Sequence, residues 1–390
     1  MRIRSIDVVL LGHRKIDPPM QRTYALIRVE AEGGFVGYGE ASSNYGHSYP
    51  TVVKAIVEDV VARNLVGQDA RDIRGRLAQM HVLLDGYLGW DGISAQVIGG
   101  VEIALFDILG KSVGLPICRL LGAAPTSLPL YGTGTTMFEA TPAWHGAYFD
   151  ACLARGFTAV KVRLDVTIPE CVERVAAVRA HVGPEVRIMV DAYWGFSTED
   201  ALTLARKLEP FDVFFFEEPS PQYQAIGLAR LAKASPVKIA VGERVYSPAQ
   251  FHEIARSGAA QVFEPDPCLC GGIIAAMEIA AIARLHDIIL VPHTGSPTPV
   301  GMAAGLHVAA AAGATLLEYD IDPSLPVRDA LMPEPIFDLS HVVDGRLAVP
   351  DGPGLGITID ESAFARFPYV AGETYAEVFP EHEAGGFRRG

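Results

Sequence analysis

The chain has 390 residues, 49% of them hydrophobic and 20% charged, so it can bury a large core. This length suggests two domains, or one large barrel with an additional domain. The formal net charge of −14 argues against nucleic acid or an anionic membrane as the main partner. It does not exclude an anionic small molecule, because a metal ion or a local group of cations can override the overall field.

The N-terminal segment contains Asp7 and no long apolar stretch, so no signal peptide is predicted. No transmembrane helix is predicted either, because no run of about 18 residues is free of polar interruptions. The apolar stretch GMAAGLHVAAAAGATLL contains His307 and is interpreted as a buried helix. Five cysteines are scattered along the chain, which is typical of buried free thiols in a reducing compartment. We therefore expect a cytoplasmic protein.

The first forty residues predict antiparallel strands. The stretch TYALIRVEAEGGFVGYGEAS alternates in polarity, turns at Gly33 and Gly34, and alternates again, which is a hairpin signal. From about residue 50 to 122 the pattern becomes helical, as in GGVEIALFDILGKSVG with its terminal glycine. Residues 1–125 are therefore predicted to form an α+β domain.

From Leu128 onward, short β-branched or aromatic runs alternate with helical segments, roughly every 25 to 30 residues, which is the period of a βα unit. Eight such runs predict an α/β fold, a (β/α)8 TIM-type barrel over residues 126–330. The remaining residues, 331–390, are predicted to pack back on the first domain. The eight runs are LPLYGTG, AVKVRL, VRIMVDAY, VFFFEEP, VKIAVGER, AQVFEPD, IILVPHT and ATLLEYD.

Three of these runs end in a carboxylate at equal intervals. Asp191, Glu217 and Glu243 are spaced 26 residues apart, and they end consecutive strands. Because neighbouring strands lie about 4.8 Å apart, the three acids can converge on one cation. Ligand sets of oxygen alone favour Mg²⁺ over Zn²⁺. The alternative is that these acids only cap the helices that follow. Either glutamate of the EEP stretch could be the ligand, and the equal spacing favours Glu217 over Glu218.

His293 ends the seventh run and Asp266 the sixth, 27 residues apart, so we expect them to be neighbours. A carboxylate beside an imidazole fixes its tautomer and raises its basicity. The other reading of a histidine, as a satisfied core residue, is assigned to His286 and His307. In the second run, Lys161 and Arg163 alternate onto the inner face of the barrel.

The combination of strand-end acids, a KVR strand, GGI and a late histidine resembles the enolase superfamily. The likeness is greatest to its mandelate racemase subgroup, and within that to acid-sugar dehydratases. It covers nearly the whole chain and includes the stretches ALFDILGKSVGLPICRLLG, EPDPCLCGGI, VPHTGSP, LEYD and PDGPGLGI. The resemblance implies a modified, enolase-like barrel whose mouth is covered by a capping domain. It also implies a Mg²⁺ cofactor and His293 with Asp266 as the general acid/base pair.

The resemblance also implies a role for Glu318, which matches an acid that hydrogen-bonds a substrate carboxylate oxygen. To donate that bond Glu318 would have to be protonated, so burial is expected to raise its pKa. The alternative is a helix-capping or salt-bridging glutamate. Members of the subgroup commonly carry a second lysine where this chain has Arg163. A guanidinium stays protonated and is a poor base, which favours a one-base reaction.

Tyr193 is a second departure, because many relatives carry Asn at this position and some dehydratases carry His. A phenol near Arg163 is a candidate acid for a leaving hydroxyl, and substrate contact or packing is the alternative. Specificity is expected from two polar loops of the capping domain, Leu11 to Pro19 and Ser42 to Pro50. They contain His13, Arg14 and His47, which are predicted to bind substrate or else to belong to plain exposed loops.

The sequence thus predicts a Mg²⁺-dependent dehydratase. It would abstract the proton α to the carboxylate of an aldonate or aldarate, expel the β-hydroxyl, and give a 2-keto-3-deoxy acid. The alternatives are a racemase or epimerase of a 2-hydroxy acid on the same scaffold, and a catalytically weak relative that binds a sugar acid. The expected partner is a small acid sugar, with no nucleic acid and no membrane, and the chain is expected to form a homo-oligomer.

Overall fold

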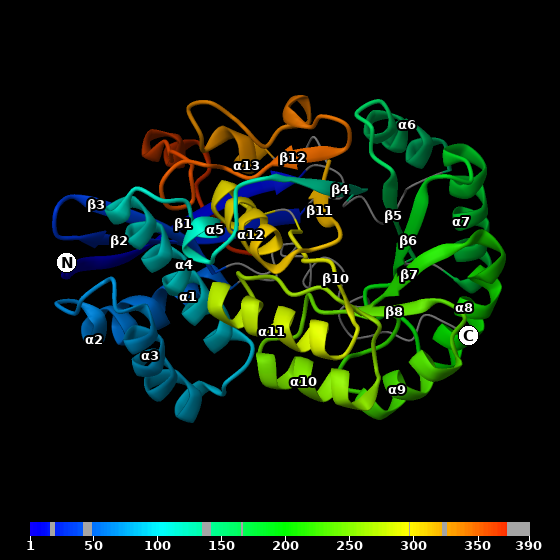
Figure 1. The fold of residues 1–390 in the computed structure, drawn as a ribbon, viewed down its shortest axis with the longest axis horizontal. Helices are drawn as coiled ribbons and strands as arrows, with labels where there is room; N and C mark the ends of the chain where they lie inside the picture. Colours follow the sequence, from blue (N-terminus) through cyan, green and yellow to red (C-terminus); the bar gives the residue numbers. More distant parts are fainter. Residues whose placement is uncertain are drawn as a thin grey trace.

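The computed structural model describes residues 1–15, 20–41, 49–134, 142–164, 167–295, 297–321 and 326–372. A capping domain built from the N-terminal part lies beside a curled parallel sheet that is surrounded by helices. In Figure 1 the cap is on the left, in blue and cyan, and the barrel extends to the right, in green and yellow. The predicted fold class, a TIM-type barrel with an α+β cap, is confirmed.

The cap contains a three-stranded antiparallel sheet in the order β1 (Ile3–Lys15), β2 (Met20–Ala31), β3 (Phe35–Glu40). The predicted hairpin between β2 and β3 is present. Its turn glycines have φ angles of 88° and 78°, which a residue with a side chain rarely adopts. One boundary was wrong, because β1 runs on to Lys15 and pairs with β2 along its whole length. Residues 11–15, assigned to a loop from their polar composition, are therefore the end of a strand.

The cap helices lie against this sheet. Their longest member, α4, packs its small residues against β3, where a Cβ atom at Gly37 or Gly39 would overlap the α4 backbone. By length and composition α4 could cross a membrane, but 89% of its apolar window is buried inside the structure, so it is a core helix. The cap helices are α1 (Pro50–Ile56), the π-helix η2 (Val57–Ala62), α2 (Arg63–Leu65), α3 (Ile73–Leu88), α4 (Ile93–Val113) and α5 (Ile117–Leu120).

All eight predicted barrel strands are present. They are parallel and follow the order β10-β9-β8-β7-β6-β5-β4-β11. The Thr315 N–H donates to the Leu290 carbonyl at 3.1 Å, which links the two ends of this order. The strands are β4 (Ser127–Thr133), β5 (Ala159–Arg163), β6 (Arg187–Asp191), β7 (Val213–Glu217), β8 (Lys238–Val241), β9 (Val262–Phe263), β10 (Ile289–Leu290) and β11 (Leu317–Asp320).

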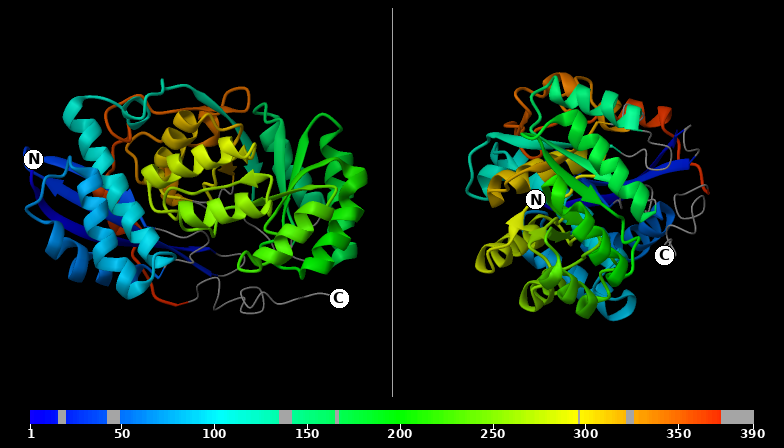
Figure 2. Two further views of the ribbon diagram at one scale, coloured as in Figure 1. Left: turned by 60° about the horizontal axis from the view of Figure 1, so that its bottom comes forward. Right: turned by 90° about the vertical axis from the view of Figure 1, so that its right-hand side faces the viewer.

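Helices cover the outside of the barrel, and Figure 2 shows them arranged around the strands. Several begin at the hydroxyl N-caps that the sequence offers: Ser197, Ser247 and Thr298 each accept a bond from a backbone N–H of the first turn. The helices are α6 (Pro142–Leu153), α7 (Ile168–Val182), α8 (Thr198–Leu208), η3 (Glu209–Phe211), α9 (Ala225–Ala234), α10 (Pro248–Ser257), α11 (Ile273–Leu285), α12 (Pro299–Ala312) and α13 (Pro326–Ala330). Helix α12 contains His307 and is buried, as predicted. The same assignment was wrong for His286, which follows the last turn of α11 and is exposed.

The C-terminal segment contains η4 (Leu339–His341), β12 (Arg346–Ala348) and η5 (Glu361–Arg366). Strand β12 pairs with the barrel strand β4. Further along, the Leu355 N–H donates to Asp107 of α4 at 2.9 Å, and the Gly12 N–H of β1 donates to the Phe367 carbonyl at 3.0 Å. The segment therefore joins the cap to the barrel.

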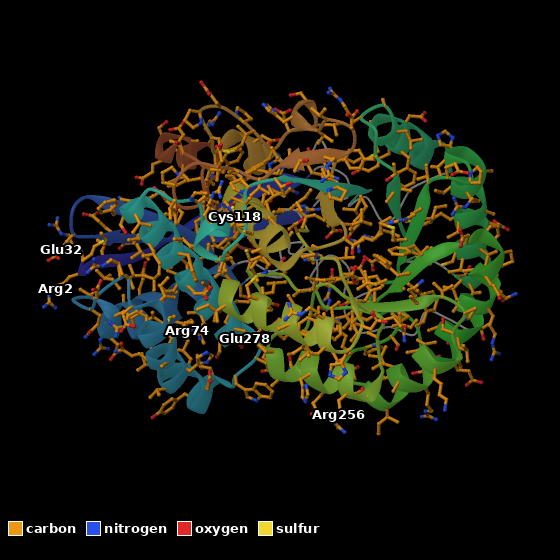
Figure 3. The ribbon with its side chains drawn as sticks, viewed as in Figure 1. Arg2, Glu32, Arg74, Cys118, Arg256 and Glu278 are labelled. Carbon is orange, nitrogen blue, oxygen red and sulfur yellow. The ribbon has the colours of Figure 1, made fainter. Side chains whose placement is uncertain are left out.

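Two buried carboxylates of the cap hold the N-termini of barrel helices. Glu40, at the end of β3, accepts from the Thr298 hydroxyl at 2.7 Å and from the Gly301 N–H at 2.9 Å, at the start of α12. Glu102 of α4 accepts from the first N–H groups of α11. Helix N-termini favour negative charge. Burial raises the pKa of Glu102 to about 8, so near neutral pH this carboxyl holds α11 mainly through its hydrogen bonds. Figure 3 labels Arg74 and Glu278 on α3 and α11, which line a cavity of about 300 Å³ at this boundary.

Candidate active site

A ring of apolar side chains fills the barrel interior, and polar side chains stand directly above it. Because side chains alternate along a strand, a residue two positions beyond an inward-facing one also faces inward. The apolar ring consists of Tyr131, Ala159, Met189, Phe215, Ala240, Val262, Val291 and Leu316. Two positions further along seven of these segments stand Thr133, Lys161, Asp191, Glu217, Glu264, His293 and Glu318, all buried. The sequence therefore gathers seven polar groups at the carboxyl end of the barrel.

Strand β8 departs from this rule, because two positions after Ala240 the chain has Gly242. A Cβ atom there would stand 2.5 Å from the nitrogen and the carbonyl oxygen of Glu264 on the neighbouring segment. Glycine is therefore required, and the next residue, Glu243, supplies the carboxylate.

Asp191, Glu217 and Glu243 converge as the spacing predicted. Asp191 pairs in register with Glu217, and one oxygen from each of the three acids lies within 4.8 Å of the others. All three side chains are at most 2% exposed. Within the described part of the chain, oxygen Oε1 of Glu217 has no hydrogen-bond partner, and burial together with the charge of Asp191 raises the pKa of Glu217 to about 8. A buried carboxylate set with an unpartnered oxygen fits a divalent cation that prefers oxygen ligands.

Lys161 and Arg163 face the same acids. Lys161 Nζ lies 2.6 Å from Glu217 Oε2 and 2.7 Å from Glu318 Oε1. Arg163, paired in register with Asp191, also forms an ion pair with it. Burial lowers the pKa of each cation, but the carboxylates outweigh it and raise both above their ordinary values. Both groups are therefore fixed positive charges and neither is suited to act as a base.

His293 and Asp266 are brought together as predicted. His293 Nδ1 lies 2.9 Å from Asp266 Oδ2, and its Nε2 lies 3.2 Å from Glu243 and 3.4 Å from Glu318. Asp266 is itself held by the Cys268 N–H at 2.8 Å. Burial lowers the pKa of His293, but these carboxylates raise it well above its ordinary value. Nδ1 is thus committed to Asp266, and Nε2 points among the acids.

Glu318 lies at the predicted place, but the expectation about its ionisation was wrong. Burial does raise its pKa, yet the charges of Lys161 and His293 outweigh burial and bring the pKa below its ordinary value. An ionised carboxylate accepts hydrogen bonds and cannot donate one. In this arrangement the donor beside Glu318 is Lys161.

Tyr193 follows Asp191 in an unusual conformation, with a φ angle of 48°, and its backbone N–H donates to Asp191 Oδ1 at 2.8 Å. The cation that lies over its ring is Arg244, with the guanidinium carbon 4.1 Å from the ring centroid. Arg244 also lies 3.2 Å from both Glu218 and Glu243. Glu218 is therefore paired with Arg244 and is not part of the carboxylate triad, in agreement with the choice of Glu217.

Two residues of the site, one buried and one partly buried, were not singled out from the sequence. Glu264 is 1% exposed, neither of its carboxylate oxygens has a hydrogen-bond partner among the described residues, and burial and Glu217 raise its pKa well above the ordinary value. The alternation in EPD, which places Glu264 on the same face as Asp266, was the available signal. Arg244 follows Glu243 directly, and nothing in its sequence context distinguished it from a surface arginine.

The substrate-binding roles predicted for the cap residues stay predictions. His13 and Arg14 lie at the end of β1, with His13 half-buried and Arg14 exposed. His47 and most of the loop Ser42 to Pro50 lie outside the described residues.

Comparisons with known proteins bear on the whole chain. Residues 16–122 match the family model of the mandelate racemase/muconate lactonizing enzyme N-terminal domain, and residues 147–363 match the model described as enolase C-terminal domain-like. The D-galactarolactone cycloisomerase of Agrobacterium fabrum is 31% identical over 94% of this chain and 99% of its own length. The arabinonate dehydratase of Saccharolobus solfataricus is 33% identical over 87% of this chain and 89% of its own.

The structure of a racemase from Streptomyces coelicolor with bound magnesium superposes with a TM-score of 0.84, at 28% identity, covering 94% of this chain and 99% of that one. The similarity to these enzymes therefore extends over nearly their full length and includes both the cap and the barrel. The chain belongs to the mandelate racemase/muconate lactonizing enzyme family of the enolase superfamily.

Proposed function

We propose that this enzyme dehydrates an acid sugar, an aldonate or an aldarate, to a 2-keto-3-deoxy acid. The observation that carries the proposal is the asymmetry of the site. His293, held by Asp266, is a proton-transfer group, whereas Arg163 supplies a permanent cation where a second base would be needed for racemisation. A single base suits removal of the α-proton followed by loss of the β-hydroxyl.

The proton α to a carboxylate is very weakly acidic, so its removal requires positive charge near the carboxylate oxygens. A Mg²⁺ ion held by Asp191, Glu217 and Glu243 would supply much of that charge. Lys161 adds a protonated amine in the same layer, and it is oriented by Glu318 and Glu217. Lys161 is therefore the proposed hydrogen-bond donor to the developing negative charge.

His293 Nε2 accepts the α-proton, while Asp266 keeps the other ring nitrogen as the hydrogen-bonded N–H. Glu243 and Glu318 raise the pKa of His293 only while their charge is uncompensated. A cation held by the triad would share the charge of Glu243 and so lower the pKa of His293, which would favour the neutral, basic imidazole. The same Nε2 then returns the proton to the leaving hydroxyl, and the enol tautomerises to the keto acid. Tyr193 stays a candidate for this donor role.

The test is a screen of the purified protein with Mg²⁺ against mono- and diacid sugars, with detection of α-keto acid and of the loss of one water by mass spectrometry. We expect turnover on a few stereoisomers and its loss in His293→Asn, which keeps a hydrogen-bonding group but removes the base. If no acid sugar gives a keto acid, the dehydratase proposal is refuted. Exchange of the α-proton in D₂O without water loss would identify a racemase or epimerase. The absence of both reactions would identify a catalytically weak binding protein.

A second candidate is cycloisomerisation of a sugar-acid lactone, favoured by the similarity to the D-galactarolactone cycloisomerase. A lactone oxygen on the β-carbon leaves as a carboxylate, which needs no proton from the enzyme. This reaction therefore suits a site with one base even better. Lactones in the same screen separate the two, because ring opening by isomerisation leaves the mass unchanged.

We also propose that the reaction takes place in the cytoplasm. All five cysteines are buried and free, and such thiols are typical of a reducing compartment.

A further inference from the structure

A second cavity, of about 560 Å³, lies beside the candidate active site between the cap and the outer helices of the barrel. Its walls come from α9, from α10 and from the loops after β6, β7 and β8, and residues 90–91 of the cap close one side. Arg256, labelled in Figure 3, marks the C-terminal end of α10. The volume is within the range of about 300 to 1,000 Å³ that is usual for small-molecule sites.

Aromatic side chains dominate this cavity. Trp90, Trp194, Tyr223 and Tyr246 all line it, and they come from four separate segments of the chain. Trp90 and Tyr223 are exposed by 51% and 79%, so their rings are available to a ligand without unfolding of the wall. Aromatic faces offer large, rigid surfaces at little cost in conformational entropy.

Planar polar groups accompany the rings. Gln222 and Gln250 line the cavity, and Gln250 bridges to Asp91 of the cap at 3.3 Å. Among the described residues, Trp194 Nε1 and Gln222 Oε1 are buried and have no hydrogen-bond partner. Both residues contribute to the wall of the cavity, but these two atoms are themselves buried, so a ligand would reach them only after the side chains turn.

We propose that this cavity binds a neutral pyranose ring. The apolar C–H face of a pyranose fits an aromatic ring, and its hydroxyl groups both donate and accept hydrogen bonds, which matches the amide and phenol groups of Gln222, Gln250 and Tyr246 in the lining. An open-chain polyol offers the same hydroxyls without the flat face.

The charges around the cavity favour a neutral ligand over an acid sugar. The cation in the wall, Arg244, is already 3.2 Å from the carboxylates of Glu218 and Glu243. Asp91 adds negative charge to the lining, and the charge of Glu253 is balanced by Arg256 at 2.7 Å. An anion would therefore meet repulsion here, whereas a neutral ring would not. The site differs in this respect from the catalytic layer, where a Mg²⁺ ion held by the acid triad would attract a carboxylate.

The ring could be a free sugar or a glycosyl group attached to an acid sugar. Arg244 connects the two sites, because it lines the cavity and also contacts Glu243 of the acid triad. The experiment therefore includes both forms, with D-glucose, D-galactose and cellobiose as neutral probes and cellobionate as the joined form.

Intrinsic fluorescence reports directly on this site, because two of the three tryptophans in the chain line it. We would titrate the Mg²⁺-free protein with each sugar, and with sorbitol as the open-chain control, and determine affinities by calorimetry. We expect a saturable change in emission with at least one pyranose and none with sorbitol. Tyr223→Ala should weaken that affinity by about tenfold, the usual loss for one aromatic contact. Tyr87→Ala is the matched control, because Tyr87 is 86% exposed and does not line the cavity.

Three results would overturn the proposal. The first is the absence of a saturable response to any pyranose at tens of millimolar. The second is sugar binding that Tyr223→Ala and Tyr87→Ala weaken equally, which would place the ligand elsewhere. The third is a molecular mass, measured by sedimentation, that differs between Tyr223→Ala and the unmodified protein when neither protein binds sugar. That result would show that a second copy of the chain covers the cavity. Binding is measured without metal or turnover, so none of these results depends on the proposed dehydration.

Discussion

A single methyl group at Gly242 is expected to disturb the candidate site. The Cβ atom of Gly242→Ala would lie 2.5 Å from the backbone nitrogen and carbonyl oxygen of Glu264, where an ordinary contact needs at least 3.4 Å. Backbone atoms cannot rotate away, so the ends of β8 and β9 must separate by roughly 1 Å, the size of displacement that can reduce activity about 100-fold. The overpacking should also lower the free energy of unfolding by about 1 to 3 kcal/mol.

The same displacement should change the geometry of the acid triad. Glu243 follows Gly242 directly, so a shift of this backbone moves one of the three carboxylates that converge within 4.8 Å. We expect Gly242→Ala to weaken Mg²⁺ binding, measured by calorimetry, by about tenfold or more, since second-sphere changes at metal sites typically cost 10- to 100-fold.

Gly86→Ala is the control, because it makes the same chemical change in α3 with no atom within 4 Å of the new methyl group. Alanine is the better helix former, so this variant should gain about 0.5 to 1 kcal/mol in urea unfolding and leave Mg²⁺ affinity unchanged. The reasoning is refuted if Gly242→Ala matches the unmodified protein in stability and Mg²⁺ affinity, or if both alanine variants shift in the same direction.

The remaining predictions concern the metal, the cap and pH. Mg²⁺ at a hundredfold excess over its Kd should stabilise the protein by about 2.7 kcal/mol, and chelation or Asp191→Asn should remove the gain in melting temperature. Glu40→Gln removes the charge that the N-terminus of α12 binds, so the free energy of unfolding in urea should fall by about 1 to 3 kcal/mol. An unchanged midpoint of the urea transition would contradict this role of Glu40. Burial lowers the pKa of His307 from 6.5 to about 4. Between pH 6.5 and 4, His307 is therefore protonated in the unfolded chain but not in the folded chain. The free energy of unfolding should fall over this range by at most roughly 3 kcal/mol. His307→Asn should flatten this part of the pH profile of the unfolding free energy, whereas the exposed His286→Asn should not.

Much of the site was predictable because it depends on regular spacing. Period-two alternation decides which residues of a barrel strand face inward, and the βα repeat decides that strand ends meet at one rim. Asp191, Glu217 and Glu243 were therefore placed together from their intervals, as were His293 and Asp266. Glu264 obeys the same alternation. It was not predicted, because Asp266, two residues later, already accounted for the polar end of this strand.

Spacing could not predict quantities that depend on all the neighbours at once. Glu318 was expected to be neutral from burial alone, but Lys161 at 2.7 Å and His293 at 3.4 Å reverse the direction of its pKa shift. Polar composition likewise suggested a loop from Leu11, yet pairing with β2 continues the strand to Lys15. In both cases a partner distant in sequence decided the outcome.

The sequence by itself determined the barrel, the cap, the triad of acids and the histidine–aspartate pair, because these follow from periodicities that the chain carries locally. Only the tertiary structure decided the ionisation of Glu318, the pairing of Arg244 with Glu218 and Glu243, and the aromatic cavity. Trp90, Trp194 and Tyr223 line that cavity although more than a hundred residues separate the first from the others. Such contacts depend on how the cap docks on the barrel, and no local pattern encodes that arrangement.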